Sequence, residues 1–294
     1  MGHGKLRKFA ENETFRCLLQ PSAEEVLADG FFHLRDHAVK GHWNETMFDA
    51  PRPIVLELGC GKGEYTIDLA QRHPECNYIG VDIKGARLWK GAKYATEHKL
   101  GNVAFLRTRI EFITAYFAAG EVSEIWLTFS DPQFRSENSR LTSPLFLERY
   151  RSFMKPGGIV HLKTDSMFLH QYSRAVAACN GLRVLGCTED LYGTPRDTIF
   201  ASDVFPSDLS TDVILSEAKD SSIDALYEVQ TFYEKMFLEQ GYKITYLSFV
   251  IDHEGPYAHP DFDEDYWRGV EGPRLLFGHD SAETRRQKLH GSSD

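Results

Sequence analysis

The sequence predicts an α/β protein built on a doubly wound, mostly parallel β-sheet. From residue 53 onward, short apolar runs typical of buried strands alternate with segments of helical spacing. Strands that alternate with helices pair in parallel through right-handed crossovers, which places helices on both faces of the sheet. The 294 residues, of which 42% are hydrophobic, suffice for one large domain with extensions and a sizeable core.

Seven segments are predicted to form the strands, and four to form the main helices. The strands are expected at 54–58, 77–82, 102–106, 124–129, 159–163, 183–187 and 243–250. The helices are expected at 63–72, 84–98, 144–155 and 226–238. Ser143 followed by Pro144 is a typical helix start, and Pro156-Gly157-Gly158 is expected to end that helix.

This pattern divides the chain into three parts. Residues 1–50 are expected to form an N-terminal extension with a short helix near 23–27, and residues 51–250 the main domain. Inside that domain, the Ser- and Asp-rich stretch 193–224 is interpreted as a polar insertion or mobile loop. Residues 251–294 are expected to form an acidic C-terminal tail.

Composition argues against several classes of protein. No apolar run approaches the roughly 18–20 residues that cross a bilayer, and the polar N-terminus does not resemble a secretory signal. Five cysteines without a CxxC pair argue against a disulfide framework or a zinc site, so we expect a reduced, cytoplasmic protein. We expect a monomer or a homodimer. The net charge of −10 argues only weakly against a nucleic-acid partner, because binding depends on a local basic patch.

The strongest local signal is the glycine-rich segment 57–63 (ELGCGKG), which follows a predicted strand and opens a predicted helix. Glycines at alternate positions let the main chain bend sharply and let a ligand lie against it. A dinucleotide-binding GxGxxG turn would need glycine at position 64, where this chain has Glu64. An acid followed by GxGxG is instead typical of methyltransferases that use S-adenosylmethionine (SAM), and Glu57 can hold the SAM ammonium group, directly or through water.

Asp82 ends the second predicted strand, where the ribose of a bound adenosine would lie. A carboxylate there can accept hydrogen bonds from both ribose hydroxyls. A glycine-rich turn alone is often structural, and an acid at a strand end is often solvated. Together, in this order and spacing, they favour a nucleoside-type cofactor. Cys60, which lies between two glycines of the turn, is interpreted as a small packing residue and not as a nucleophile.

Three further segments narrow the choice of enzyme: 129–132 (FSDP), 163–165 (KTD) and 231–234 (TFYE). With ELGCGKG they resemble, in order, the motifs of the bacterial tRNA (guanine-N7)-methyltransferase family, over about residues 40–249. The resemblance implies a Rossmann-like class I SAM methyltransferase fold, with seven strands and a C-terminal antiparallel strand. It also implies methyl transfer from SAM to N7 of a guanosine in the tRNA variable loop, at position 46 in tRNA numbering.

Carried over position by position, the resemblance implies roles for individual residues. Asp131 would lie beside both cofactor and target base and is the implied catalytic residue. The implied cofactor contacts are Glu57, Asp82 and Asp131, and the glycine-rich turn itself adds Gly59, Gly61 and Gly63 as expected contacts. The implied RNA contacts are Arg135, Asp165, Thr231 and Glu234.

The sequence departs from the family pattern in two places. After Asp131-Pro132 the family usually has a tryptophan and a dense basic run, whereas residues 133–140 are shorter and less basic here. The family also tends to have an acid after the third strand, where this chain has Arg109. A backbone amide near Arg109-Ile110 is expected to meet the adenine instead.

The chemistry is consistent with these residues. Guanine N7 carries an in-plane lone pair and no proton, so an in-line displacement at the SAM methyl carbon needs no general base. Asp131 is expected to act by positioning and by stabilising the charge that develops on the purine. Its structural alternative is a simple Asp-Pro turn.

Two alternatives to tRNA methylation remain at this stage. One is a SAM-dependent methyltransferase that acts on a protein or small molecule, and the other is a catalytically silent binding partner that kept the fold. The cations of one predicted helix help to distinguish an RNA substrate from these alternatives. Together with cations near the N-terminus, they can form either a solvated face or a phosphate-facing patch. These cations are Lys84, Arg87, Lys90 and Lys93, with Lys5, Arg7 and Lys8 in a possible N-terminal arm.

Overall fold

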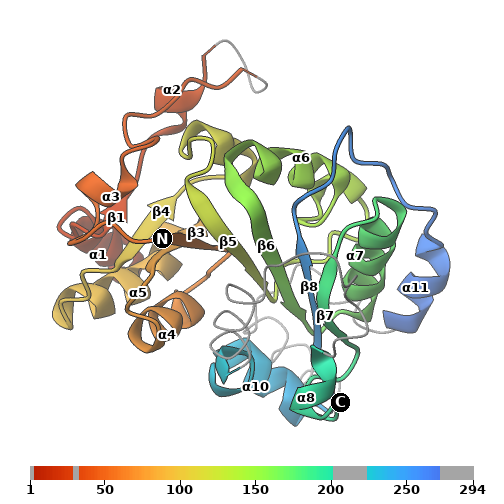
Figure 1. Cartoon of the computed structure of the whole chain (residues 1–294). Coiled ribbons are helices and arrows are strands. Elements are labelled where there is room, and N and C mark those ends of the chain that lie inside the picture. The colour runs from red at the N-terminus through yellow and green to blue at the C-terminus, as the bar shows by residue number, and fades with distance from the viewer. Residues whose placement is uncertain (1–2, 29–32, 201–223, 272–294) are drawn as a thin grey trace.

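The computed structural model describes residues 3–28, 33–200 and 224–271, which are built around one eight-stranded sheet (Figure 1). The strands are β1 (Leu18–Leu19), β2 (Ile54–Leu58), β3 (Asn77–Asp82), β4 (Val103–Arg107), β5 (Val122–Thr128), β6 (Met154–Thr164), β7 (Val184–Thr188) and β8 (Thr245–Val250). Their order is β1-β4-β3-β2-β5-β6-β8-β7. Strands β1 to β6 pair in parallel, and β8 is antiparallel to both β6 and β7. The predicted mostly parallel sheet with a C-terminal antiparallel strand is confirmed.

The eighth strand is the short edge strand β1, which the sequence did not predict. Leu18 and Leu19 lie opposite Phe105 and Leu106 of β4. Two residues are too few to show the alternation by which a strand is recognised in a sequence.

The helices follow the predicted alternation from α4 onward. They are α1 (His3–Asn12), α2 (Ala23–Val26), α3 (Trp43–Thr46), α4 (Glu64–Arg72), α5 (Gly85–Glu97), α6 (Pro144–Phe153), α7 (Met167–Cys179), α8 (Arg196–Ile199), α10 (Phe232–Glu239) and α11 (Glu264–Glu271), with 3₁₀ turns η1 (Ile110–Ala115) and η2 (Glu137–Ser139). Ser143 caps α6 as expected, because its hydroxyl accepts a hydrogen bond from the amide of Phe146. The prediction of a single helix at 226–238 is wrong. Residues 224–228 are helical, residues 229–231 are not, and Thr231 caps the next helix, α10.

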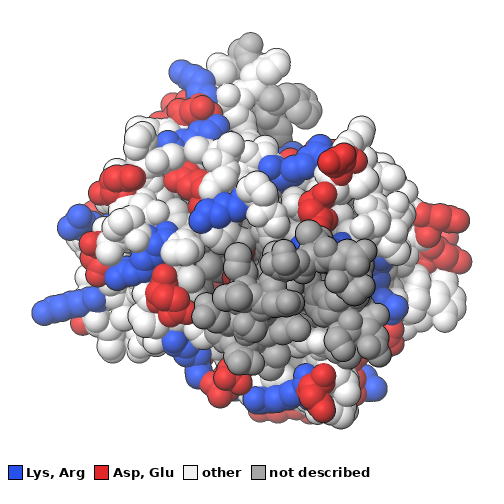
Figure 2. Space-filling view, viewed as in Figure 1, with Lys and Arg blue, Asp and Glu red and all other residues white. Residues whose placement is uncertain are grey.

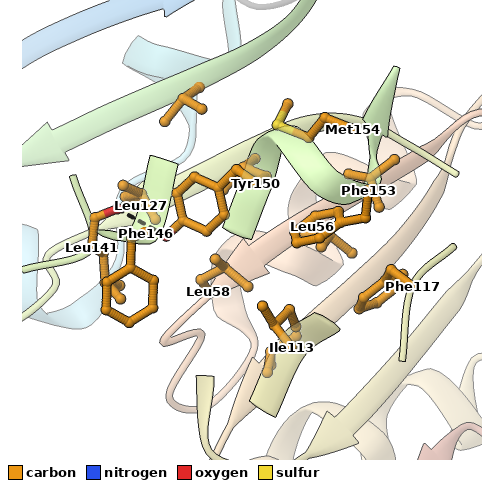
Figure 3. Close-up of a cluster of buried hydrophobic side chains, with 14 of the residues drawn as sticks. Leu56, Leu58, Ile113, Phe117, Leu127, Leu141, Phe146, Tyr150, Phe153 and Met154 are labelled. Carbon is orange, nitrogen blue, oxygen red and sulfur yellow. Dashed lines mark hydrogen bonds between the residues drawn. The ribbon is translucent and has the colours of Figure 1, made fainter. Parts of the chain in front are cut away.

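Two hydrophobic layers cover the sheet, one on each face. Helices α6 and α7 and the turn η1 pack on one face, where Phe146, Tyr150 and Phe153 of α6 meet β2 residues such as Leu56 and Leu58 (Figure 3). Helices α4 and α5 pack on the opposite face. Since each face is covered, the central strands β2 and β3 are buried along their whole length, as parallel strands of this kind are.

The N-terminal segment is integrated with the sheet domain. The Trp43 side chain is fully buried, and its indole nitrogen donates to the carbonyl of Tyr116 at 2.8 Å. Helix α1 packs on α5, where Asn12 donates to the carbonyl of Gly85 at 3.0 Å. The division of the chain at residues 50 and 250 stays a prediction.

Some predicted features lie partly or wholly outside the described residues. This applies to residues 201–223 of the polar insertion, to residues 272–294 of the acidic tail and to the Lys5 side chain. Of the insertion, the described start contains α8. Of the tail, the described part contains α11, which the sequence did not predict. Among the described residues, none of the helices has the length and apolar character needed to cross a membrane.

Candidate active site

The glycine-rich turn joins β2 to α4 at the carboxyl end of the parallel strands. Gly59, Gly61 and Gly63 have φ angles of 82°, 57° and 71°, in the left-handed region that favours glycine. A Cβ atom at Gly59 or Gly61 would meet no atom within 4 Å. The turn therefore presents bare main chain to open space, and a ligand can lie there at the edge where such sheets bind their ligands.

Gly63 has a packing role that its neighbours in the turn lack. A Cβ atom at Gly63 would lie 2.5 Å from Cε1 of Phe105, a buried residue of β4. The same ring fills the space beside Gly80 and Gly91. Gly63 thus lets the start of α4 approach the sheet, and a cofactor contact at this position stays a prediction.

Asp82 is fixed beside the turn at the end of β3. Its Oδ2 accepts a hydrogen bond from the Gly61 amide at 3.0 Å, and its Oδ1 accepts one from the Lys84 amide at 2.6 Å. Burial raises the pKa of Asp82, and the hydrogen bond from Lys84 and the charge of Arg87 oppose that shift. Each carboxylate oxygen keeps a further lone pair, so Asp82 can still accept from ribose hydroxyls.

Glu57 lies beneath the turn, at the end of β2. One of its carboxylate oxygens accepts from the amide of Thr66 at 2.9 Å and from the Thr66 hydroxyl, and the other from the Thr128 hydroxyl at 2.5 Å. Burial raises the pKa of Glu57 to about 7, and these hydrogen bonds oppose the rise. Glu57 thus ties β2 to α4 and β5, and sequence reasoning had not found its threonine partners. Its contact with an ammonium group stays a prediction.

Asp131 is exposed on the loop that follows β5. Its Oδ1 accepts a hydrogen bond from the Gln133 amide at 2.9 Å, which closes a local turn. Phe129 and Gln133 have φ angles of 52° and 50°, so two non-glycine residues around Asp131 are in the left-handed region. Such a backbone persists where its surroundings hold it. Here the Phe129 amide donates to the carbonyl of Lys163 in the adjacent strand β6, at 2.9 Å.

The residues after β4 and β6 lie at the same edge of the sheet. Arg109 precedes η1 and pairs with Glu111 at 3.1 Å, and the half-buried Ile110 begins the turn. Asp165 is half-buried and directly follows β6, while Arg135 is exposed on the loop after Asp131. The carboxyl ends of β2 to β6 thus bring most of the predicted site residues to one edge.

Thr231 and Glu234 are placed differently from the other predicted RNA contacts. Thr231 is 8% exposed and accepts from the Glu234 amide at 3.2 Å, which caps α10. Glu234 is fully buried and forms an ion pair with the equally buried Lys163 at 2.8 Å. The Phe232 amide donates to Glu64 of α4 at 3.1 Å, so α10 is held against the helix that follows the glycine turn. Both side chains anchor α10 here, and contacts between them and RNA stay predictions.

The basic face of α5 is partly neutralised by acids. Lys90 pairs with Glu64 at 2.8 Å, and Lys93 lies 3.6 Å from Glu97. Figure 2 shows Lys and Arg side chains interspersed with Asp and Glu on the visible face of the molecule. The sequence places no acid between these four cations, but the fold brings acids beside two of them, because Glu64 comes from a neighbouring helix and Glu97 from the next turn.

The described residues offer no cluster of side chains that could hold a metal ion. No group of three or more His, Cys, Asp or Glu side chains among them can hold a metal ion, and all five cysteines are free. A pocket of about 390 Å³ lies at the opposite end of the strands, beside Arg52 and Asn102. We place the candidate site at the glycine turn nevertheless, because the open main chain and the fixed carboxylate of Asp82 lie there.

Comparisons with known proteins identify the family. A family model described as a putative methyltransferase matches residues 51–197. The tRNA (guanine-N(7)-)-methyltransferase of Christiangramia forsetii is 46% identical over 249 residues, which are 84% of this chain and 97% of the relative. The protein of the same description from Bacteroides thetaiotaomicron is 42% identical over 266 residues, which are 90% of this chain and 92% of the relative. The chain therefore belongs to the tRNA (guanine-N(7)-)-methyltransferase family.

Proposed function

We propose that this protein transfers a methyl group from SAM to N7 of a guanosine in the tRNA variable loop, at position 46 in tRNA numbering. The names of its relatives support the substrate. The open main chain at Gly59 and Gly61, with the Asp82 carboxylate fixed beside it, is the structural observation that carries the proposal. Both lie at the strand ends where α/β sheets bind nucleoside-containing ligands.

The residues at this edge fit SAM. Gly59 and Gly61 leave room for its amino-acid portion, and the free lone pairs of Asp82 suit the ribose hydroxyls. The amide near Arg109-Ile110 would face the adenine, and Glu57 would act on the ammonium group. SAM carries no phosphate, so the turn needs no cation to hold one. When bound, it supplies an electrophilic methyl carbon on a sulfonium.

Asp131 would act on the guanine without taking a proton from it. N7 has a lone pair and no hydrogen, so the reaction proceeds by in-line displacement without a general base. An exposed carboxylate at the end of β5 can accept from guanine N1–H and N2–H, which orients the base. Its negative charge would also stabilise the positive charge that moves onto the purine.

The surface formed by α1 and α5 is our proposed tRNA-binding face. Lys8 and Lys93 lie over the Trp89 ring at 4.6 and 5.2 Å from its centroid, which draws cations of both helices together. Lys84 and Arg87 lie at the start of α5, next to Asp82 and hence to the proposed SAM site. Arg135 and Asp165 would complete the contacts at the strand ends.

The deciding experiment is methylation of bulk tRNA with labelled SAM, followed by nucleoside analysis. We expect the label in 7-methylguanosine, and its loss when the target guanosine at position 46 is replaced in a single transcript. Label in another nucleoside, or in protein and not in RNA, would contradict the proposal. A protein that binds SAM but transfers no methyl group would indicate the silent binding partner instead.

The RNA surface is tested separately by salt dependence. Reversing Lys84 and Arg87 to Glu should weaken tRNA binding and reduce the slope of log K against log salt by about one for each phosphate that the variant no longer neutralises. Lys155, an exposed residue near the start of β6, is the matched control. An unchanged slope would mean that the α5 cations are merely solvated.

We also expect a cytoplasmic location, because the proposed substrate is tRNA. Size-exclusion chromatography would distinguish a monomer from a homodimer.

A further inference from the structure

Helix α11 lies against α7 at the side of the molecule (Figure 1) and outside the residues that the family model matches. It contacts two segments that carry predicted site residues. One is the loop 131–140, which carries Asp131 and is less basic here than in the family pattern. The other is the turn 165–166, which carries Asp165, together with the first residues of α7.

The first contact compensates a buried charge. Arg140 ends the loop and is fully buried, with its guanidinium 4.4 Å from the Tyr172 ring centroid and 4.8 Å from that of Phe168. Its Nη2 pairs with Oε1 of Glu264 in α11 at 2.8 Å, and its Nε donates to the Gln133 carbonyl at 3.4 Å. A buried cation needs an opposite charge. Glu264 supplies one, and the same Arg140 side chain holds the backbone at Gln133, one of the two left-handed residues around Asp131.

The second contact holds the loop backbone directly. Arg268 of α11 donates to the carbonyl of Phe134 from Nε at 3.1 Å and from Nη2 at 2.6 Å. The same guanidinium pairs with Glu264. The Phe134 ring packs on Phe168 of α7, with 4.9 Å between centroids. The loop is therefore held both through its main chain and through an aromatic contact.

The third contact holds the turn that carries Asp165. Glu271, at the end of α11, is 7% exposed, and its Oε1 accepts from the Ser166 hydroxyl at 2.5 Å and from the Phe168 amide at 2.7 Å. A carboxylate is favoured at the N-terminus of a helix, where it binds free amides. Ser166 also donates its amide to the Thr164 hydroxyl at 3.0 Å, so both residues next to Asp165 are fixed.

We infer that α11 is a positioning element of the active site. Glu264 and Arg268 hold the loop that carries Asp131, and Glu271 holds the turn that carries Asp165. None of the three touches the reacting atoms, and all act through other residues. The inference rests on the proposed function, since it assumes that Asp131 and Asp165 serve the same reaction.

The test uses the full chain with Glu264→Gln and Glu271→Gln, and Asp265→Asn as the matched control. Asp265 is on the same helix and also pairs with Arg268 at 2.9 Å, but its side chain is 94% exposed, so removing its charge leaves no buried group uncompensated. Turnover of tRNA is measured per SAM-binding site, so that any unfolded fraction does not count. We expect kcat to fall about tenfold or more in both Gln variants, as misplaced reacting groups cause. The Kd for SAM should change less than about twofold, and Asp265→Asn should match the wild type.

Hydrogen exchange gives a readout that does not depend on activity. In Glu264→Gln, and not in Asp265→Asn, the amides of residues 133–139 should exchange faster than in the wild type. Arg268→Lys keeps a donor for the Phe134 carbonyl and should retain more turnover than Arg268→Met.

Unchanged kcat and unchanged loop exchange in both Gln variants would overturn the inference, as would a loss confined to SAM affinity. A wild-type protein that does not methylate tRNA would overturn the proposed function instead. The exchange comparison would still show whether α11 holds the loop.

Discussion

The Lys163–Glu234 ion pair is the interaction whose removal has the most calculable effect. Both side chains are fully buried, and Nζ lies 2.8 Å from Oε1. Lys163 also donates to the carbonyls of Leu226 and Val229 at 2.6 and 3.2 Å, and Glu234 accepts from the Tyr192 hydroxyl at 2.6 Å. Burial lowers the pKa of Lys163, and the Glu234 charge opposes that shift. Removing either partner would leave the other in the interior without its counter-charge.

We predict that Lys163→Met and Glu234→Gln each lower the free energy of unfolding by about 3–5 kcal/mol, the cost of breaking a buried pair. At about 2–4 °C per kcal/mol in larger domains, Tm should fall by roughly 6–20 °C. The double variant contains neither charge, so it should lose less than the sum, with a coupling of about 1–3 kcal/mol.

The assay is thermal and urea unfolding, followed by circular dichroism, of the wild type, both single variants and the double variant. The pair of Lys243 and Asp190, at 3.0 Å, has side chains that are 65% and 33% exposed and supplies the control, because Lys243→Met should cost less than about 1 kcal/mol. Additive losses, or a single variant as stable as this control, would refute the reasoning. A Glu234→Gln protein with wild-type stability and weakened tRNA binding would show that Glu234 serves RNA instead.

Three further predictions concern the site. Asp131→Asn keeps the acceptor for the Gln133 amide but removes the charge, so the rate of single-turnover methyl transfer should fall by about two orders of magnitude or more. The affinity for SAM, measured by calorimetry, should stay within a few-fold. Normal turnover would reject the catalytic role of Asp131. The pKa of Glu57 in the folded protein, about 7, exceeds its ordinary value of 4.5, so the wild type should lose about 3 kcal/mol of stability as the pH rises through this window. Glu57→Gln should abolish this loss. The same change of urea midpoint with pH in both proteins, across about pH 5 to 8, would contradict the prediction. In Gly63→Ala the new Cβ atom would meet the Phe105 ring, whereas at Gly120, which has a similar φ of 72°, it would enter open space. Gly63→Ala should therefore lower the free energy of unfolding by about 1–3 kcal/mol more than Gly120→Ala. Equal Tm values for the two variants would exclude this steric explanation.

Elements with a strong local signal could be predicted from the sequence. The runs at 54–58 and 77–82 coincide with β2 and β3, and Ser143-Pro144 begins α6 as expected. Residues that follow consecutive parallel strands must meet at one edge, so the grouping of Asp82, Asp131 and Asp165 at that edge could be expected too. The helix α11 was missed although Glu264 and Asp265 in its first turn are a known N-terminal signal, because these acids were interpreted only as part of a charged tail.

By itself the sequence determined the alternation of strands and helices, the glycine turn and the family. These depend on periodicity, on backbone conformations open to glycine and on short motifs, all of which are local properties. Only the tertiary structure decided which charged side chains are buried and with which residues they form ion pairs. Glu234 faces Lys163 from 71 positions away, and Arg140 meets Glu264 across 124. Such pairs form because folding removes both groups from water together, and burial of this kind leaves no pattern along the chain.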